Sequence, residues 1–159
     1  MTKTEACAEE IAMPVLLRHA RGTYGVAMRK ALAEAGFDDV PKNGLYVIGG
    51  LAMDEVEIPL GQLIKELRVS KQAAGQLVDM LVLRGYLERT VDTVDRRKLT
   101  VTLTERGRAA AAAQAVALKK IDAELIARVG LENVSRTRRT LAALIDLGCE
   151  KAGEQDDEP

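Results

Sequence analysis

Apolar residues in the middle of the chain recur at helical spacing. In two segments, residues 58–67 and 70–84, they fall at i, i+3, i+4 and i+7, so each segment has one apolar stripe. Arg68 and Val69 fit a tight turn between the two helices, and Ser70 is placed to cap the second. We therefore predict a helix–turn–helix. Its stripes consist of Leu60, Leu63, Ile64 and Leu67, and of Ala74, Leu77, Val78 and Leu81.

The residues that follow predict a hairpin. Gly85 can take the left-handed conformation that ends a helix, and residues 86–91 fit a first strand. Residues 99–103 alternate apolar and polar side chains, which is typical of a strand, and Thr104 is placed to cap the next helix. A helix–turn–helix followed by such a hairpin is a winged helix. The expected fold is mainly α, with a small two-to-three-stranded antiparallel sheet.

The outer face of the second predicted helix has the chemistry of a DNA-recognition helix. Lys71, Gln72 and Gln76 lie near its N-terminus, opposite the apolar stripe. Gln suits bidentate contact with adenine, and Lys suits guanine or a phosphate. We assign Ser70 mainly to capping, with a phosphate contact as a second role. These four residues are the candidate DNA-binding set of the helix.

The hairpin loop is basic at its tip. Arg96, Arg97 and Lys98 could reach phosphates or the narrow minor groove while the helix occupies the major groove. Asp95 could instead pair with Arg97 and stiffen the hairpin. Charge supports this reading: residues 65–108 hold ten Lys and Arg against six Asp and Glu, whereas the whole chain has a net charge of −1. The positive charge is thus local to the predicted winged helix.

These residues resemble the MarR family (multiple antibiotic resistance regulators). The resemblance lies in a recognition helix that starts with serine, a Leu-x-x-x-Gly-Tyr-Leu-x-Arg exit, a wing with Asp-x-Arg, and Leu-Thr-x-x-Gly at the next helix. Two positions depart from the pattern: Gly75 stands where Ser or Thr is common, and Gln76 where a basic residue is common. Both concern operator contacts and not the fold. The matching residues are Ser70, Leu81 to Arg89, Asp95, Arg97, Leu103, Thr104 and Gly107.

The resemblance implies a homodimer that binds double-stranded DNA at an inverted repeat. The first and last helices would build the dimer, and we expect the protein to act as a transcriptional repressor. The family often binds small aromatic, phenolic or lipophilic acids between the dimer arms and the winged helix. His19, Tyr24 and Tyr46 could line such a site here, although each could equally be an ordinary core or interface residue.

The flanks predict helical arms. Apolar stripes favour helices over residues 14–36, 41–52, 109–130 and 135–149, and in the last of these Leu141, Leu144 and Ile145 are expected to face inward.

We expect one MarR-like domain over residues 1–159. Its parts are N-terminal helices and linker at 14–57, the winged helix at 58–104, C-terminal dimerisation helices at 105–150, and a disordered acidic tail at 151–159.

Other classes are disfavoured. With one histidine and no triad, metal-ligand spacing or phosphate loop, we expect no enzyme, cofactor or metal site. Nothing resembles a membrane span or a leader, and two distant cysteines fit the cytoplasm. Acidic neighbours argue against a reactive thiol at Cys7. The alternative kept open is a winged helix that binds protein rather than DNA, which would favour an apolar outer face on the second helix.

Overall fold

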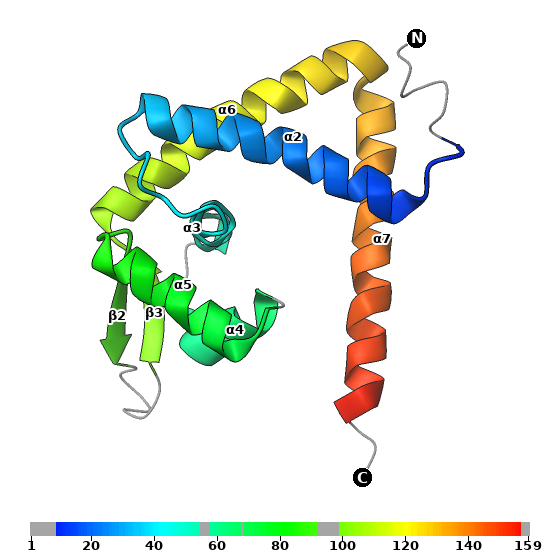
Figure 1. Ribbon diagram of the computed structural model, residues 1–159. Helices are drawn as coiled ribbons and strands as arrows, with labels where there is room; N and C mark the ends of the chain where they lie inside the picture. Colours follow the sequence, from blue (N-terminus) through cyan, green and yellow to red (C-terminus); the bar gives the residue numbers. More distant parts are fainter. Residues whose placement is uncertain (1–8, 55–57, 68, 92–98, 157–159) are drawn as a thin grey trace. The chain divides into compact units, whose positions relative to one another are not determined.

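The computed structural model describes residues 9–54, 58–67, 69–91 and 99–156 (Figure 1). The chain divides into two compact units, residues 1–118 and 119–159. Asp95, Arg96, Arg97, Lys98 and Cys7, which the sequence singled out, lie outside the described residues.

The first unit contains the predicted winged helix. Its three strands form an antiparallel sheet in the order β1-β3-β2, with Ile58 opposite Val101 and Leu87 opposite Leu103. The predicted fold class, mainly α with a small antiparallel sheet, is therefore confirmed. The elements are α2 (Met13–Glu34), α3 (Gly44–Asp54), β1 (Ile58–Pro59), α4 (Leu60–Glu66), α5 (Lys71–Leu83), β2 (Leu87–Val91), β3 (Leu99–Leu103) and the start of α6 (Glu105–Val129).

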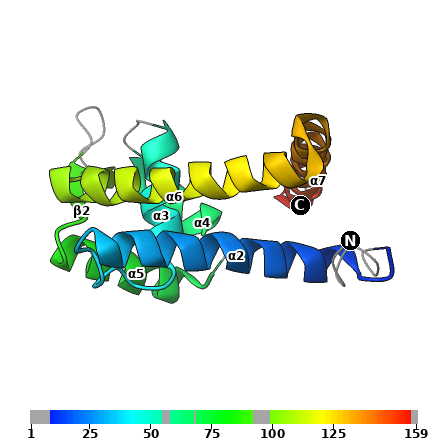
Figure 2. The same cartoon turned by 90° about the horizontal axis from the view of Figure 1, so that it is seen from above.

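Helix α3 contacts both α2 and α6, and it runs across the direction of these two helices (Figure 2). Small residues allow this arrangement. A methyl group on Gly25 of α2 would lie 2.9 Å from the hydroxyl of Tyr46 on α3, and one on Gly49 of α3 would lie 3.2 Å from Oε1 of Gln114 on α6. The core continues from α3 into the sheet and α5. Its largest fully buried apolar side chains are Tyr86, Leu45, Ile48, Leu81 and Leu87.

The predicted helix ends are confirmed by their capping geometry. Ser70 Oγ accepts a hydrogen bond from the backbone N–H of Ala73 at 3.2 Å, at the start of α5. Gly85 and Gly130 have φ angles of +73° and +85°, in the left-handed region, where each follows the end of a helix. The start of α5 and its exit into β2 therefore follow from local sequence, whereas Arg68, predicted to lie in the turn before α5, is outside the described residues.

The second unit consists of the end of α6 and helix α7 (Leu131–Asp156). Arg138 of α7 donates to Asp122 of α6 across 2.6 Å. Helix α7 is longer than the predicted helix over 135–149, and it includes residues 151–156 of the segment expected to be disordered.

Not all apolar side chains of α7 that were expected to face inward are buried within the single chain. Leu144 and Ile145 are exposed and Leu141 is half-buried, whereas the sequence predicted that all three face inward. The physical reason is that this unit offers no second layer to cover them. None of the helices in the described part of the chain combines the length and apolar character that a membrane crossing requires.

Candidate nucleic-acid interface

Helix α5 has one buried face and one polar exposed face. Ala74, Val78 and Leu81 have no measurable exposure, because they pack into the core of the first unit. Lys71 and Gln72 are exposed in the first turn of the helix, close to the cap at Ser70. The first turns of α5 thus present side-chain donors and acceptors, together with the positive end of the helix dipole, to solvent.

Two further positions shape this face. Gln76 is exposed one turn after Gln72, so the two amides lie on the same side of the helix. Gly75 lies between them, and a methyl group placed there would meet no atom within 4 Å. Glycine is therefore not required at this position by packing, and the lack of a side chain leaves open space on the exposed face of α5.

An ion pair connects α5 to the sheet. Asp79, on the exposed side of α5, accepts a hydrogen bond from Arg89 of β2. The pair neutralises a carboxylate that would otherwise repel phosphate, and it joins the helix to the first strand of the hairpin. Beneath it, the Oγ1 atoms of Thr90 and Thr100 are 2.6 Å apart across the two strands. The described base of the hairpin is therefore tied to α5 and internally cross-linked.

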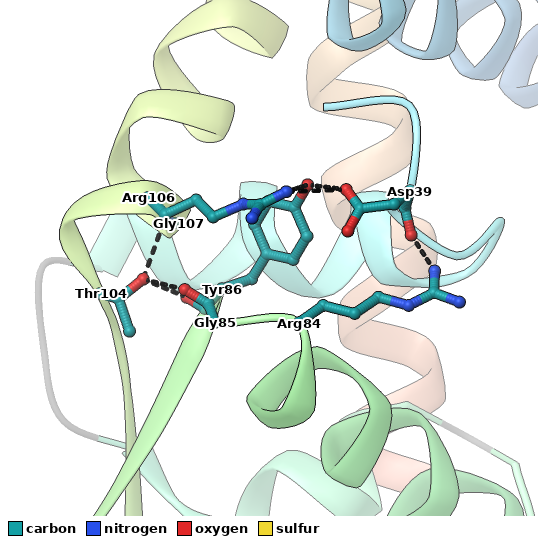
Figure 3. A network of polar contacts seen from close by, with 7 residues as sticks. All are labelled: Asp39, Arg84, Gly85, Tyr86, Thr104, Arg106 and Gly107. Carbon is teal, nitrogen blue, oxygen red and sulfur yellow. Dashed lines mark hydrogen bonds and ion pairs between the residues drawn. The ribbon is translucent and has the colours of Figure 1, made fainter. Parts of the chain in front are cut away.

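A second polar cluster lies behind the helix, and we call it the Asp39 junction: Asp39, Arg84, Tyr86 and Arg106 (Figure 3). The carboxylate of Asp39 accepts from the hydroxyl of Tyr86 and, at 3.0 Å, from Nη2 of Arg106. The backbone carbonyl of Asp39 accepts from the guanidinium of Arg84. Arg106 also donates to the Tyr86 hydroxyl at 3.1 Å.

The ring of Tyr86 anchors this cluster to the core. The side chain is fully buried, and the ring of Phe37 meets it edge to face with centroids 6.2 Å apart. The guanidinium of Arg106 lies over the ring of Tyr86, 4.6 Å from its centroid. The hydroxyl and the ring of Tyr86 both contact charged groups while the ring also packs in the core, so one side chain links the apolar core to the charged cluster.

Charge and hydrogen bonding shift two acidities in the junction. The hydroxyl of Tyr86, followed by the charge of Arg106, lowers the pKa of the Asp39 carboxyl, although burial opposes the shift. Burial, reinforced by the hydrogen bond to Asp39, raises the pKa of Tyr86. The ionised carboxylate and the neutral phenol are therefore the favoured forms at neutral pH.

The start of α6 is packed tightly against the exit of α5. Thr104 Oγ1 accepts from the backbone N–H of Gly107 at 3.0 Å, as expected of an N-cap, and donates to the carbonyl of Gly85 at 2.5 Å. A methyl group on Gly107 would overlap the carbonyl oxygen of Tyr86. Only glycine allows the first turn of α6 to approach the α5–β2 turn this closely.

The Asp39 junction was not predicted from the sequence. Tyr86 and Gly107 stood inside the motifs of the family resemblance, but Asp39 did not, and Arg84 and Arg106 were given no role. Asp39 lies 47 residues before Tyr86 and 67 before Arg106, so no local spacing connects them. The one available signal was the aspartate pair at 38–39 directly after a helix end, which is also common in solvated turns.

The three candidate effector residues lie in different surroundings. His19 is exposed on α2, whereas Tyr24 is half-buried against the core. Tyr46 is also half-buried; its hydroxyl donates to the carbonyl of Arg21 at 3.4 Å, and the guanidinium of Arg21 lies 4.1 Å from its ring centroid. Tyr46 lies at the contact between α2 and α3, Tyr24 packs against the core, and His19 differs from both in being exposed.

The helix–turn–helix, the paired hairpin base and the capped α5 define a winged-helix protein. Residues 46–98 match the model of the MarR family, and this confirms the resemblance drawn from the motifs. The family consists of transcription regulators rather than enzymes. No curated protein matches the chain.

Solved structures of this family share the fold. MepR of S. aureus in its DNA-binding conformation has a TM-score of 0.69 at 16% identity, over 86% of this chain and 98% of MepR. Wild-type MarR of E. coli, in its apo form, has a TM-score of 0.62 at 20% identity, over 84% and 97%. The transcriptional repressor CouR, bound to a 23-mer DNA duplex, has a TM-score of 0.67 at 18% identity, over 91% and 99%.

Proposed function

We propose that the protein is a sequence-specific DNA-binding transcription regulator that places α5 in the major groove. The observation that carries the proposal is the capped, exposed and polar N-terminal half of α5. Lys71, Gln72 and Gln76 project from a helix whose opposite face is fixed in the core. A rigid helix with amide and basic side chains at its exposed N-terminus suits base-edge recognition. The DNA-bound CouR structure, which shares the fold, supports the same assignment.

Selection of bound genomic fragments, followed by sequencing, would identify the operator and test the proposal. On that operator we expect Gln72→Ala and Gln76→Ala each to lower the preference over scrambled DNA by about 1–3 kcal/mol. Gln62→Ala, an exposed glutamine on α4, is the matched control and should leave the preference unchanged. Equal binding of operator and scrambled DNA by the wild-type protein would contradict the proposal.

The wing is proposed to add contacts that do not depend on sequence. Strands β2 and β3 pair as far as Val91 and Leu99, and the basic residues Arg96, Arg97 and Lys98 follow in the loop between them. Replacing one arginine with alanine should weaken binding to all duplexes and reduce the salt slope by about one ion. Wild-type salt dependence in the double arginine variant would exclude the wing from the interface.

The regulator is proposed to act as a homodimer on an inverted repeat. Support comes from the exposed apolar side chains of α7, among them Ile145 at 61% exposure, because contiguous surface of this kind marks an interface. Two winged helices related by a twofold axis would meet two half-sites, and repression would follow from blocking the promoter. Light scattering should give twice the chain mass of 17.2 kDa. A monomer that binds an asymmetric site would contradict this part.

A small aromatic or lipophilic acid is proposed to release the DNA. Support comes from Tyr24 on α2 and Tyr46 on α3, which are half-buried against the core and could contact a planar ligand, and His19 supplies a polar group on the same helix as Tyr24. By linkage, a ligand must lower DNA affinity if it binds more tightly when the two recognition helices of the dimer are at a distance that does not fit the operator. Titration with salicylate should raise the melting temperature and weaken operator binding together. A raised melting temperature with unchanged affinity would disprove the coupling.

A protein-binding winged helix remains the second candidate, and one observation favours it. At the end of α5, Met80 is partly exposed and Leu83 is 87% exposed, which is unusual for large apolar side chains. A gel shift on genomic fragments separates the two candidates, since a protein-binding module would shift none of them. The polar N-terminal half of α5 favours DNA.

A further inference from the structure

We propose that the Asp39 junction positions the recognition helix relative to α6 and thereby sets the operator spacing that the protein accepts. This inference rests on the proposed function. It assigns Asp39, Tyr86 and Arg106 as positioning residues for DNA binding, although none of them lies on the exposed face of α5. The reason is that Asp39 contacts three segments, and the relative placement of these segments determines the orientation of α5.

The first segment is the loop between α2 and α3, which contributes Asp39 itself. The second is the exit of α5, where Arg84 caps the helix and Tyr86 precedes β2. Arg84 donates to the backbone of Asp39 and Tyr86 to its carboxylate. Two consecutive contacts from the end of α5 thus converge on one residue of the α2–α3 loop, as Figure 3 shows.

The third segment is the first turn of α6, which is held on two sides. Arg106 donates to the same carboxylate oxygen of Asp39 that accepts from Tyr86. On its inner side, Gly107 is in contact with the carbonyl of Tyr86. The direction in which α6 leaves the winged helix is therefore fixed by backbone packing on one side and by the junction on the other.

A small change in that direction has a large effect at a distance. Helix α6 has 25 residues, so its axis is about 37 Å long. A tilt of about 10° at its start would displace its far end by about 6 Å, on the order of two base-pair steps along the DNA axis. In a dimer paired through its C-terminal helices, the same tilt would change the distance between the two recognition helices.

The junction contributes more to position than to stability. The side chains of Asp39 and Arg106 are 39% and 45% exposed, and an ion pair at so exposed a site contributes little to the stability of a fold. Tyr86, by contrast, is buried through its ring, which the loss of the hydroxyl's partner leaves in place. Removing the carboxylate should therefore loosen the orientation of α6 without unfolding the core.

The test compares Asp39→Ala with Asp38→Ala. Asp38 is the exposed neighbour, and its loss changes the net charge by the same amount. Each variant and the wild-type protein are titrated with duplexes in which the two half-sites of the selected operator are moved apart or together by one and two base pairs. The measured quantity is the affinity ratio between the preferred spacing and each altered spacing.

We expect Asp39→Ala to reduce that ratio at least about fivefold, the lower end of typical coupling between sites, and Asp38→Ala to keep it. Tyr86→Phe, which retains the ring and loses only the hydroxyl, should reduce it in the same direction. Thermal unfolding should show that all three variants are folded. A purely stabilising junction would change the melting temperature and not the ratio.

If the wild-type protein discriminates spacings and both Asp39→Ala and Tyr86→Phe keep its ratio, the positioning role is wrong and the proposed function stands. If the wild-type protein binds no duplex, the proposed function fails, and this inference fails with it. A reduced ratio in Asp38→Ala as well would assign the effect to net charge and would also overturn the positioning role.

Discussion

The two units of the chain differ in where their apolar side chains lie. In residues 1–118 the buried apolar residues between Met28 and Ala111 form one core shared by helices and sheet, although some apolar residues, such as Leu83, are exposed. In residues 119–159, Val134 is buried, but Leu131, Ile145 and Leu147 are more than half exposed. The first unit has a hydrophobic core of its own, whereas the second presents apolar side chains along a long amphipathic helix.

The difference shows that an apolar stripe in the sequence identifies one face of a helix but does not identify the surface that packs against it. The stripes of α5 and α7 look alike along the chain, yet α5 is covered by the chain itself and α7 is not. A helix stripe with no intramolecular partner requires a second surface, and another copy of the same helix is the simplest one. Each unit should therefore respond to a different kind of substitution.

The largest effect should come from Gly107→Ala, which changes a packed contact inside the first unit. The added methyl group overlaps the carbonyl of Tyr86, so the α6 start must move away from the α5–β2 turn. We expect a loss of about 3 kcal/mol in the free energy of unfolding, measured with urea. Gly22→Ala on α2, where a methyl group meets nothing within 4 Å, is the control and should stabilise the protein by roughly 0.5–1 kcal/mol. Similar stabilities for the two variants would contradict the packing argument.

The second largest effect should come from a substitution in α7 that affects dimerisation and leaves the first unit folded. Ile145→Asp places a charge in the exposed apolar stripe of α7, where pairing would have to desolvate it. We expect the dimer to weaken by about 2 kcal/mol or more, which analytical ultracentrifugation would measure, while the circular dichroism of the winged helix is retained. Ala143→Asp, exposed two positions away on another side of the helix, should leave the association unchanged. A wild-type dimerisation constant in Ile145→Asp would place the interface elsewhere.

A smaller and opposite effect is expected at Gln114. Its side chain is 1% exposed, and neither its amide nitrogen nor its oxygen has a hydrogen-bond partner among the described residues. Burying an unsatisfied amide costs free energy, so Gln114→Leu should raise the free energy of unfolding by about 1 kcal/mol. Gln62→Leu, at an exposed site on α4, controls for the change in composition. Destabilisation by Gln114→Leu would mean that the amide has a partner in solution.

The smallest effect is the pH dependence of the junction. The folded pKa of Asp39 is lowered, so its contribution to stability is present above the unfolded value of 3.8 and is lost as pH falls through the folded value. The pKa of Tyr86 is raised, so its contribution is present below 10 and is lost as pH rises through the folded value. Because Asp39 is partly exposed, we expect the acid effect to be about 0.5 kcal/mol or less.

Chemical denaturation at several pH values would measure this effect. Asp39→Ala should reduce the loss of stability below pH 4, and Asp38→Ala should not. Tyr86→Phe should reduce the loss of stability above pH 10. Identical pH profiles for Asp39→Ala and the wild-type protein would show that the carboxylate has no folded-state preference.

Local features of the fold could be predicted from the sequence because their causes are local. The Ser70 cap, the left-handed Gly85 and the Thr104 cap each depend on residues within one helical turn, and all three are present. The exposure of Lys71, Gln72 and Gln76 followed from the stripe on the other side of α5. Periodicity was sufficient wherever neighbours along the chain decide the conformation.

Features that depend on distant residues could not be predicted in the same way. Asp39 meets its partners only after α2, α5 and α6 have packed, so its role depends on tertiary structure. The expectation that Leu144 and Ile145 face inward failed because periodicity identifies a face and not its partner. The extent of α7 was also underestimated, because the acidic composition of residues 151–156 indicated disorder.

The order of the two units along the chain has a consequence for biosynthesis. Unit 1 ends at residue 118, so the ribosome completes it before the 119–159 segment that carries the exposed apolar helix. At roughly 5–20 residues per second, that segment follows within about 2 to 8 seconds. The exposed apolar helix is therefore synthesised when unit 1 is already complete. It is then the apolar surface that a folded unit 1 presents to a second copy of the chain. Chains translated from one message would then supply the second copy close by.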